Sequence, residues 1–348
     1  MRTKTLVMKK FGQKKFVIPA AACLAVILFL CYYYFFSPML ASGNVGIVYV
    51  DGDDNIDSVY VKLEAVSKHH ALSGFKTLAR HSSYGEHIRT GRYEISDGEG
   101  AFAVFRKLKN GLQSSVRLTV PSVRTADKLA GALSKKLMMD SVEIYNALTD
   151  SATCAKYGYK PETMLCMFIP NTYEVYWNTS VDKFLDKMSS ESKKFWNFER
   201  TQKAKAMGFS KEEVMTLASI VDEETANDAE KPMVAGMYYN RLKRGMPLQA
   251  DPTVKFALKD FGIRRIYHNM LVVDSPYNTY RNTGLPPGPI RIPSVAGIDA
   301  VLDHVRHGYL YMCAKEDFSG THNFAETYAE HLENAARYSA ALNDRGIK

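Results

Sequence analysis

The sequence predicts a membrane-anchored α+β protein in which two folded regions follow one N-terminal helix. Three observations support this: an uncharged apolar run near the N-terminus, a region of alternating short strands and helices, and a capped amphipathic helix downstream. A length of 348 residues with 46% hydrophobic content suffices for about two domains with buried cores. We expect a cytoplasmic basic tail at 1–15, a transmembrane helix at 16–36, and domains at 43–150 and 151–348.

The segment 16–36 reads FVIPAAACLAVILFLCYYYFF and contains no charged residue. At a rise of about 1.5 Å per residue, this helix can cross a hydrocarbon core of about 30 Å. Only basic charges precede it and the first acid after it is Asp51, which predicts a cytoplasmic N-terminus and an extracytoplasmic remainder. A cleaved signal peptide is the competing interpretation, but the run exceeds a signal h-region and lacks a small-x-small cleavage site.

Composition argues against several other classes of protein. Six of the 45 basic residues precede the first acid, which leaves 39 basic against 37 acidic residues and gives no reason to expect nucleic acid as a partner. We expect no metal or other cofactor, because the sequence has no clustered Cys and His with the spacing of metal ligands. Cys154 and Cys166 are compatible either with a disulfide or with isolated core thiols.

The region 43–150 alternates short β-rich runs with amphipathic helices, which predicts a small α+β domain. The expected strands are 45–50, 87–95 and 116–120, and the expected helices are 74–80, 101–108, 125–137 and 142–148. Further on, 181–207 is predicted to be a long helical segment whose aromatic residues belong to the core.

The most informative stretch is a helix that begins after Ser210. Ser210 and Glu213 have the spacing of a capping box. The apolar stripe of this helix consists of Val214, Leu217, Ala218 and Val221. Glu224 lies almost directly above the stripe, whereas Asp222 and Glu223 rotate to opposite flanks. A carboxyl group on a core-facing stripe loses hydration, which raises its pKa and suits it to general acid catalysis near neutral pH; a frayed acidic helix end is the alternative.

A second helix is predicted from about 230 to Gly245, so the two helices form a hairpin. The run 246–253 then carries Gln249 and Asp251 between prolines that stiffen it, as in a site loop. A further run, 275–290, has too many prolines and glycines for a regular helix or central strand. Its interleaved Tyr and Asn residues suit a sugar groove, because aromatic faces stack on sugar rings and amides bond hydroxyls.

Several of these stretches match one family pattern: 218–225 reads ASIVDEET, 240–242 reads NRL and 245–254 reads GMPLQADPTV. On these residues, and on 275–290, the chain resembles the endolytic murein transglycosylase family (MltG, YceG-like). The catalytic Glu of that family directly precedes a Thr, which places it at Glu224, in agreement with the helix periodicity. Among the positions that depart from the family pattern, Asp222 replaces a Glu, Ser294 replaces a Gly and Asn171 replaces an Asp.

The resemblance implies a lytic transglycosylase that cleaves the MurNAc-GlcNAc β-1,4 bond of nascent peptidoglycan strands without water. Such cleavage leaves 1,6-anhydroMurNAc ends and limits strand elongation, with Glu224 as both acid and base. The residues expected to position the sugar are Asn240, Gln249, Asp251, Tyr277, Asn278 and Tyr280. The implied location is the inner (cytoplasmic) membrane, where peptidoglycan synthases are candidate partners.

Weaker matches lie outside these stretches. The region 43–150 resembles the family's LysM-like segment at 91–93 (GRY) and 105–111 (FRKLKNG), which leaves a glycan-binding module or a plain spacer as interpretations. His322 lies in a further match, THNF at 321–324, and by itself is interpreted as structural.

Two alternative functions remain. The first is a peptidoglycan hydrolase in which Glu224 and Asp251 form the carboxylate pair of a glycosidase. The second, from a different class, is a non-catalytic wall-binding or divisome scaffold. The products formed from purified peptidoglycan would separate these alternatives.

Overall fold

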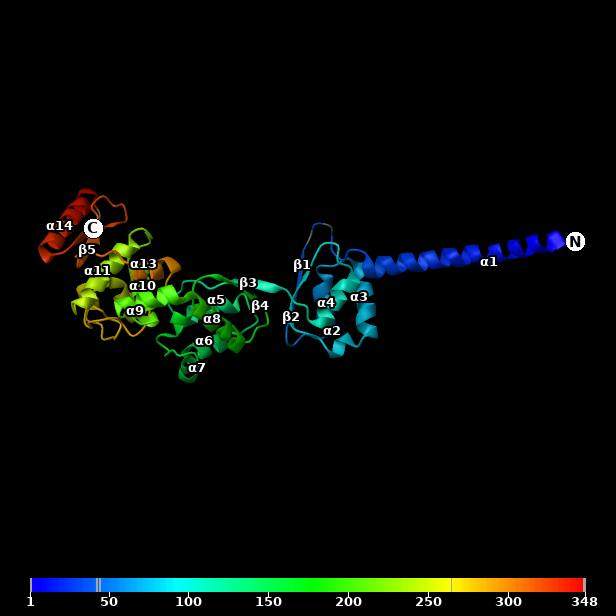
Figure 1. Ribbon diagram of the computed structural model, residues 1–348, viewed down its shortest axis with the longest axis horizontal. Helices are drawn as coiled ribbons and strands as arrows, with labels where there is room; N and C mark the ends of the chain where they lie inside the picture. Colours follow the sequence, from blue (N-terminus) through cyan, green and yellow to red (C-terminus); the bar gives the residue numbers. More distant parts are fainter. Residues whose placement is uncertain (1, 42, 44, 264, 347–348) are drawn as a thin grey trace. The chain divides into compact units, whose positions relative to one another are not determined.

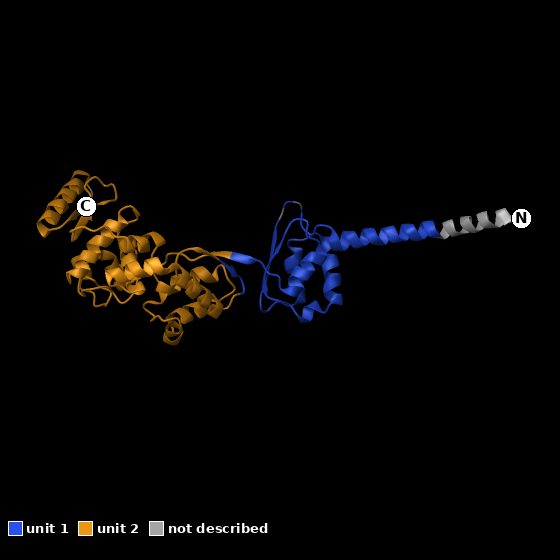
Figure 2. Ribbon diagram, in the orientation of Figure 1, with its two compact units in different colours: residues 1–116, 174–178 blue, residues 117–173, 179–348 orange. Residues whose placement is uncertain are grey.

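The computed structural model describes residues 2–41, 43, 45–263 and 265–346, and Figure 1 labels their helices and strands. The chain divides into two compact units, the first comprising 1–116 and 174–178 and the second 117–173 and 179–348 (Figure 2). This division differs from the predicted boundary near residue 150. The reason is that α6 (Ser141–Thr149) packs against α8 (Val181–Phe195) within the second unit.

The first unit begins with α1 (Arg2–Cys31), which continues into a π-helical turn, Tyr32–Phe36. Within this helical segment, Val17–Phe36 is long and apolar enough to cross a membrane, with a mean hydropathy of 2.1 and no buried residue. Its position agrees with the predicted transmembrane segment at 16–36.

The rest of the first unit is a small α+β fold. Strand β1 (Gly46–Val50) pairs antiparallel with β2 (Gly91–Ile95), and the pairing matches Val48 with Tyr93, whose side chains are buried. The helices are α2 (Ile56–Glu64), α3 (His69–His81) and α4 (Ala101–Asn110). The predicted strand at 87–95 is confined to its second half, and α2 was not predicted.

The end of the apolar helix packs closely against the rest of the first unit at two glycines. A Cβ atom on Gly74 of α3 would overlap the carbonyl oxygen of Tyr34, and one on Gly100 would overlap the backbone of the same π-helical turn. Tyr33 stacks on His70, with ring centroids 4.1 Å apart. Only glycine permits this approach of the two backbones. The helix end and the α+β fold of the first unit therefore form one packed body.

The second unit is mainly helical. Its helices besides α6 and α8 are α5 (Ala126–Ser134), α7 (Ser151–Lys156), α9 (Phe198–Met207), α10 (Lys211–Glu224), α11 (Lys231–Lys243), α12 (Asp251–Leu258), α13 (Val295–Leu302) and α14 (Tyr328–Asp344). Strand β5 (Tyr311–Ala314) pairs antiparallel with β6 (His322–Ala325). Strands β3 (Ser115–Thr119) and β4 (Thr172–Tyr176) also pair, and each contains a point where the chain passes between the units.

Helix α10 is the centre of the second unit. Residues 214–221 are all buried, so apolar neighbours surround the helix and not only the predicted stripe. The predicted capping box is present, because Ser210 and Glu213 each accept a hydrogen bond from the backbone of the other. Cys154 and Cys166 are buried and free, as the isolated-thiol interpretation predicted, and burial raises the pKa of both.

Two predicted elements differ in shape. The expected long helix at 181–207 is interrupted between α8 and α9, where the side chain of Asn197 accepts a hydrogen bond from the Arg200 amide and starts a new helix. The expected loop at 246–253 ends in α12, which begins at Asp251 with Pro252 in its first turn.

Candidate active site

A cleft of about 240 Å³ opens at the C-terminal end of α10. It is lined by Glu224, Met237, Tyr238, Arg241, Leu248, Gln249, Asp251, Tyr280, Met312, Cys313, Ala314 and His322. The α10–α11 hairpin, the segment 248–251, Tyr280 and the β5–β6 strands all contribute to it. The predicted hairpin and two predicted loops therefore meet at one cleft.

Glu224 is the last residue of α10 and is partly buried in this cleft. Desolvation raises the pKa of Glu224 to about 7, the Tyr238 hydroxyl lowers it by donating to Oε1 at 2.6 Å, and the Asp251 charge raises it. The direction of this shift is the one that the helix periodicity predicted for a core-facing carboxyl group. A carboxyl group with such a pKa can both donate and accept a proton near neutral pH.

Gln249 and Asp251 reach the cleft from a constrained loop. The backbone of Gln249 is left-handed, with φ of 53°, a region that residues other than glycine adopt rarely and often at functional sites. Its amide donates to the Thr279 carbonyl at 3.1 Å, and its Oε1 accepts from Arg241 at 3.2 Å. The Tyr280 hydroxyl donates to Asp251 Oδ1 at 2.6 Å. The structure therefore brings Gln249, Asp251 and Tyr280 together, as predicted.

Arg241 and Tyr238 are cleft residues that sequence reasoning missed. The buried Arg241 guanidinium donates to the carbonyls of Leu310 at 2.6 Å, Pro247 at 3.1 Å and Leu248 at 2.9 Å. It thereby joins the Gln249 loop to the chain that enters β5. The available signal was spacing, because Tyr238 and Arg241 lie three residues apart on α11 and so share one face.

Asn240, predicted to position the sugar, does not line this cleft. Its side-chain amide donates to the carbonyls of His307 at 2.8 Å and Tyr309 at 3.1 Å, which fastens that segment to α11. Asn240 instead borders a separate groove of about 680 Å³, together with Tyr239 and Lys243. The contacts of Asn240 are those of a structural residue.

Asn278 and Tyr277, both expected to position the sugar, also lie outside the lining of this cleft. Asn278 is fully buried, and its amide donates to two carbonyls of the preceding turn at 2.8 and 2.9 Å. Its Oδ1 accepts from the Tyr280 amide at 3.0 Å, and Tyr277 packs on Phe256 with ring centroids 4.7 Å apart. These residues shape the loop that places Tyr280 in the cleft.

Asn278→Ala is therefore expected to destabilise the protein. The substitution removes two hydrogen bonds made by the buried Asn278 amide, which costs about 1–3 kcal/mol and lowers the melting temperature by several degrees. Thermal unfolding measures this effect, with Thr283→Ala as the control because Thr283 is an exposed residue of the same loop. An unchanged melting temperature combined with lost glycan binding would return Asn278 to the substrate site.

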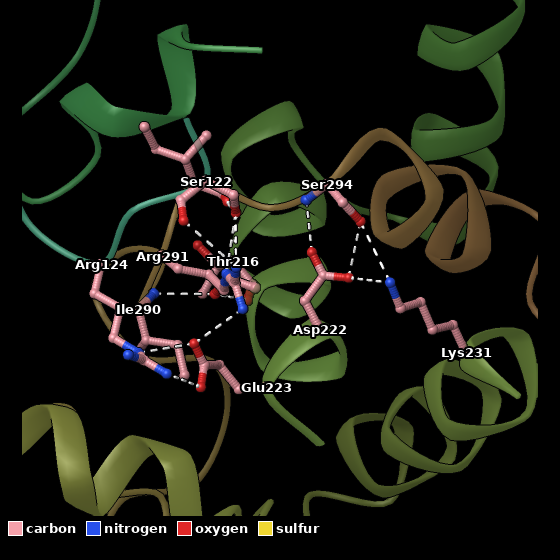
Figure 3. Close-up of polar contacts among 11 residues, drawn as sticks. Ser122, Arg124, Thr216, Asp222, Glu223, Lys231, Ile290, Arg291 and Ser294 are labelled. Carbon is pink, nitrogen blue, oxygen red and sulfur yellow. Dashed lines mark hydrogen bonds and ion pairs between the residues drawn. The ribbon is translucent and has the colours of Figure 1, made fainter. Parts of the chain in front are cut away.

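The two acids before Glu224 lie on opposite sides of α10, as the helix periodicity predicted (Figure 3). Glu223 accepts a bidentate pair of hydrogen bonds from Arg124, at 2.9 Å from Nε and 2.8 Å from Nη2. Arg291 adds a third bond, to Oε1 at 3.1 Å. Planar pairing of this kind fixes orientation as well as charge, so it holds the last turn of α10 on this side.

On the other side, Asp222 accepts hydrogen bonds from the Ser294 amide at 2.6 Å and the Ser294 hydroxyl at 2.9 Å (Figure 3). Lys231 pairs with the same carboxylate at 2.7 Å, and the side chains of Asp222 and Lys231 are only 3% and 7% exposed. Asp222 and Ser294 are also positions at which the sequence departs from the family pattern. The Asp222 side chain, which is shorter than the Glu of the family pattern, thus accepts a hydrogen bond from the Ser294 hydroxyl, a group that the glycine of the family pattern lacks.

These features define a class of protein that holds one proton-exchanging carboxyl group at the end of a central buried helix. The profile of the YceG-like family matches residues 48–337, so the chain belongs to this family and the predicted resemblance is confirmed.

Relatives of known name agree with this assignment. The chain is 28% identical over 274 residues to the endolytic murein transglycosylase of Bacillus subtilis (strain 168), which covers 74% of this chain and 75% of that protein. It is 25% identical over 320 residues to the endolytic murein transglycosylase of Streptococcus pneumoniae (strain D39), covering 82% of this chain and 56% of that protein. A crystal structure of a putative yceG-like protein from Listeria monocytogenes covers 84% of this chain and 99% of its own, with a TM-score of 0.55 and 25% identity.

Proposed function

We propose that the protein is an endolytic peptidoglycan lytic transglycosylase. It cleaves the β-1,4 bond between MurNAc and GlcNAc within nascent strands, leaves 1,6-anhydroMurNAc ends and so limits strand elongation. The observation that carries this proposal is the desolvated Glu224, whose pKa of about 7 suits a single group that acts in turn as acid and base. The names of its curated relatives support the substrate class.

The proposed reaction needs one carboxyl group and no water. Protonated Glu224 gives its proton to the glycosidic oxygen as the bond from that oxygen to the MurNAc anomeric carbon breaks. The resulting carboxylate then takes the proton of the MurNAc 6-hydroxyl as its oxygen bonds to the same carbon, which restores the acid. General acid–base catalysis of this kind contributes typically 10²–10⁴-fold. The Tyr238 hydrogen bond stabilises the carboxylate between the two steps.

Mass spectrometry of the products tests this proposal. Purified peptidoglycan treated with the protein in ¹⁸O-labelled water should yield fragments one water lighter than hydrolysis products, without a reducing end and without label. Labelled reducing ends formed in step with cleavage would support the hydrolase alternative, in which Asp251 assists Glu224. Binding of peptidoglycan without any cleavage would support the scaffold alternative.

The pH dependence of cleavage should report on the surroundings of Glu224. Because the first step uses the protonated acid, kcat/KM should fall as the pH rises through the Glu224 pKa of about 7. Tyr238→Phe removes a hydrogen bond that lowers this pKa, so the alkaline limb should move to higher pH. Asp251→Asn removes a charge that raises the pKa, so the limb should move to lower pH. Shifts in the same direction would contradict the assignment of Glu224 as the acid.

We propose further that α1 anchors the chain in the cytoplasmic membrane with the N-terminus inside and the second unit outside. The basic tail and the uncharged helix support this orientation. Protease added to spheroplasts is expected to digest the second unit. Full protection of the chain, or a mature N-terminus that begins after residue 36, would exclude this topology.

A further inference from the structure

A nearly buried carboxylate–histidine pair borders the cleft. Glu230 is 8% exposed and precedes α11, where a helix N-terminus favours negative charge. Its carboxylate accepts a hydrogen bond from the His322 amide at 2.6 Å and another from the His322 ring nitrogen Nδ1 at 3.0 Å. His322 in turn lines the cleft that contains Glu224.

These bonds determine the tautomer of the His322 ring. An ionised carboxylate only accepts hydrogen bonds, so Nδ1 carries the proton and Nε2 is the ring nitrogen left to bond a ligand. His307 provides a contrast within the same unit. Its Nε2 contacts the Met233 carbonyl at 3.0 Å and its Nδ1 accepts from the Tyr309 amide at 3.1 Å, so both nitrogens serve the fold. His322 has the pattern of an oriented functional ring, because Nδ1 is held by Glu230 whereas Nε2 has no hydrogen-bond partner among the residues that the structure describes.

We propose that His322 contacts the substrate through Nε2, which accepts a hydrogen bond from a hydroxyl or amide N–H of the N-acetylated sugar beside Glu224. Glu230 is the positioning residue that fixes the ring and its tautomer. This inference rests on the proposed function, because the cleft must hold a glycan. It replaces the interpretation of His322 as structural that its sequence context alone suggested.

Two substitutions of His322 separate this role from a structural one. In His322→Asn the amide nitrogen takes the place of Nδ1 and keeps the bond to Glu230, but nothing replaces Nε2. In His322→Gln the amide group takes the place of Nε2 and can still accept from a sugar, but the bond to Glu230 is lost. A substrate contact predicts that Asn lowers kcat/KM tenfold or more and that Gln retains more activity. A purely structural role predicts the reverse order, with the melting temperature following activity.

Glu230→Gln tests the positioning role. The Gln amide can donate to Nδ1, which moves the ring proton to Nε2 and turns an acceptor into a donor. Activity should fall about as far as in His322→Asn, and the double variant should lose little more, because the two residues act as one unit. His304→Asn is the control, since His304 lies in the separate groove and its substitution should leave cleavage unchanged. Additive losses in the double variant would overturn the coupling.

Binding measurements keep this inference separate from the proposed reaction. Titration calorimetry with a peptidoglycan tetrasaccharide, in the Glu224→Gln background, should show weaker binding when His322→Asn is added. If the unsubstituted protein binds the tetrasaccharide through His322 but does not cleave, the proposed reaction fails and the contact stands. If binding and cleavage are both unchanged by His322→Asn, or if no glycan binds at all, the contact is refuted.

Discussion

Glu224→Gln is expected to abolish glycan cleavage while the protein stays folded and binds glycan. Glutamine keeps the shape of the side chain and can still accept the Tyr238 hydrogen bond, but it cannot cycle a proton. The loss should reach at least the 10²–10⁴-fold that general acid–base catalysis supplies, since one group serves both steps. Release of anhydro-ended fragments, measured against the unsubstituted protein, gives the result.

The same variant should differ in its pH dependence of stability. Folding raises the Glu224 pKa to about 7 from 4.5, so the folded state holds this proton more tightly than the unfolded state. The unsubstituted protein therefore loses stability as the pH rises from about 4.5 through 7, and Glu224→Gln should remove that loss. Unfolding at pH 5 and pH 8 measures the difference. Unchanged cleavage by the Gln variant would reject Glu224 as the acid, whatever its stability.

Asp222→Asn is expected to cause the largest loss of stability. Asp222 and Lys231 form a nearly buried ion pair, and removing the Asp222 charge leaves the buried Lys231 with only the exposed Asp228 as an ionic partner, which costs up to about 3–5 kcal/mol. Asp228→Asn is a matched control, because Asp228 pairs with the same Lys231 at 2.7 Å but its side chain is 70% exposed. Such exposed pairs contribute about 0–1 kcal/mol.

Chemical denaturation measures both variants under one set of conditions. Equal losses of unfolding free energy in the two variants would mean that the buried Asp222–Lys231 pair stabilises the fold no more than the exposed Asp228–Lys231 pair does. That result would contradict the role of the buried pair in fixing the end of α10. Asp222→Asn should also lower cleavage at temperatures where it remains folded, because Asp222 lies two residues before Glu224 on the same helix.

Local signals in the sequence predicted the structural frame of the site well. The Ser210 capping box and the 3.6-residue period suffice to place Glu224, because both act within a few residues of the chain. They do not reveal the chain that surrounds α10, which makes the helix buried on every side at 214–221.

The polar partners of the site are distant in sequence and were predicted poorly. Asn240 bonds a carbonyl 69 residues away, and His322 pairs with a carboxylate 92 residues away. A side-chain amide in a loop looks the same in sequence whether it bonds a sugar or a backbone carbonyl. Asn240 and Asn278 were therefore assigned to the sugar, whereas Tyr238, Arg241 and His322 were not assigned to the cleft.

The glycine contacts at the end of the apolar helix have a mechanical consequence for an anchored protein. A flexible linker of glycine and serine would let the attached fold sample many orientations at the membrane surface. Here Gly74 and Gly100 place the fold in direct backbone contact with the helix end at Tyr34, Phe35 and Phe36. Any tilt or rotation of the helix in a bilayer of different thickness would therefore change the orientation of the rest of the first unit by the same angle.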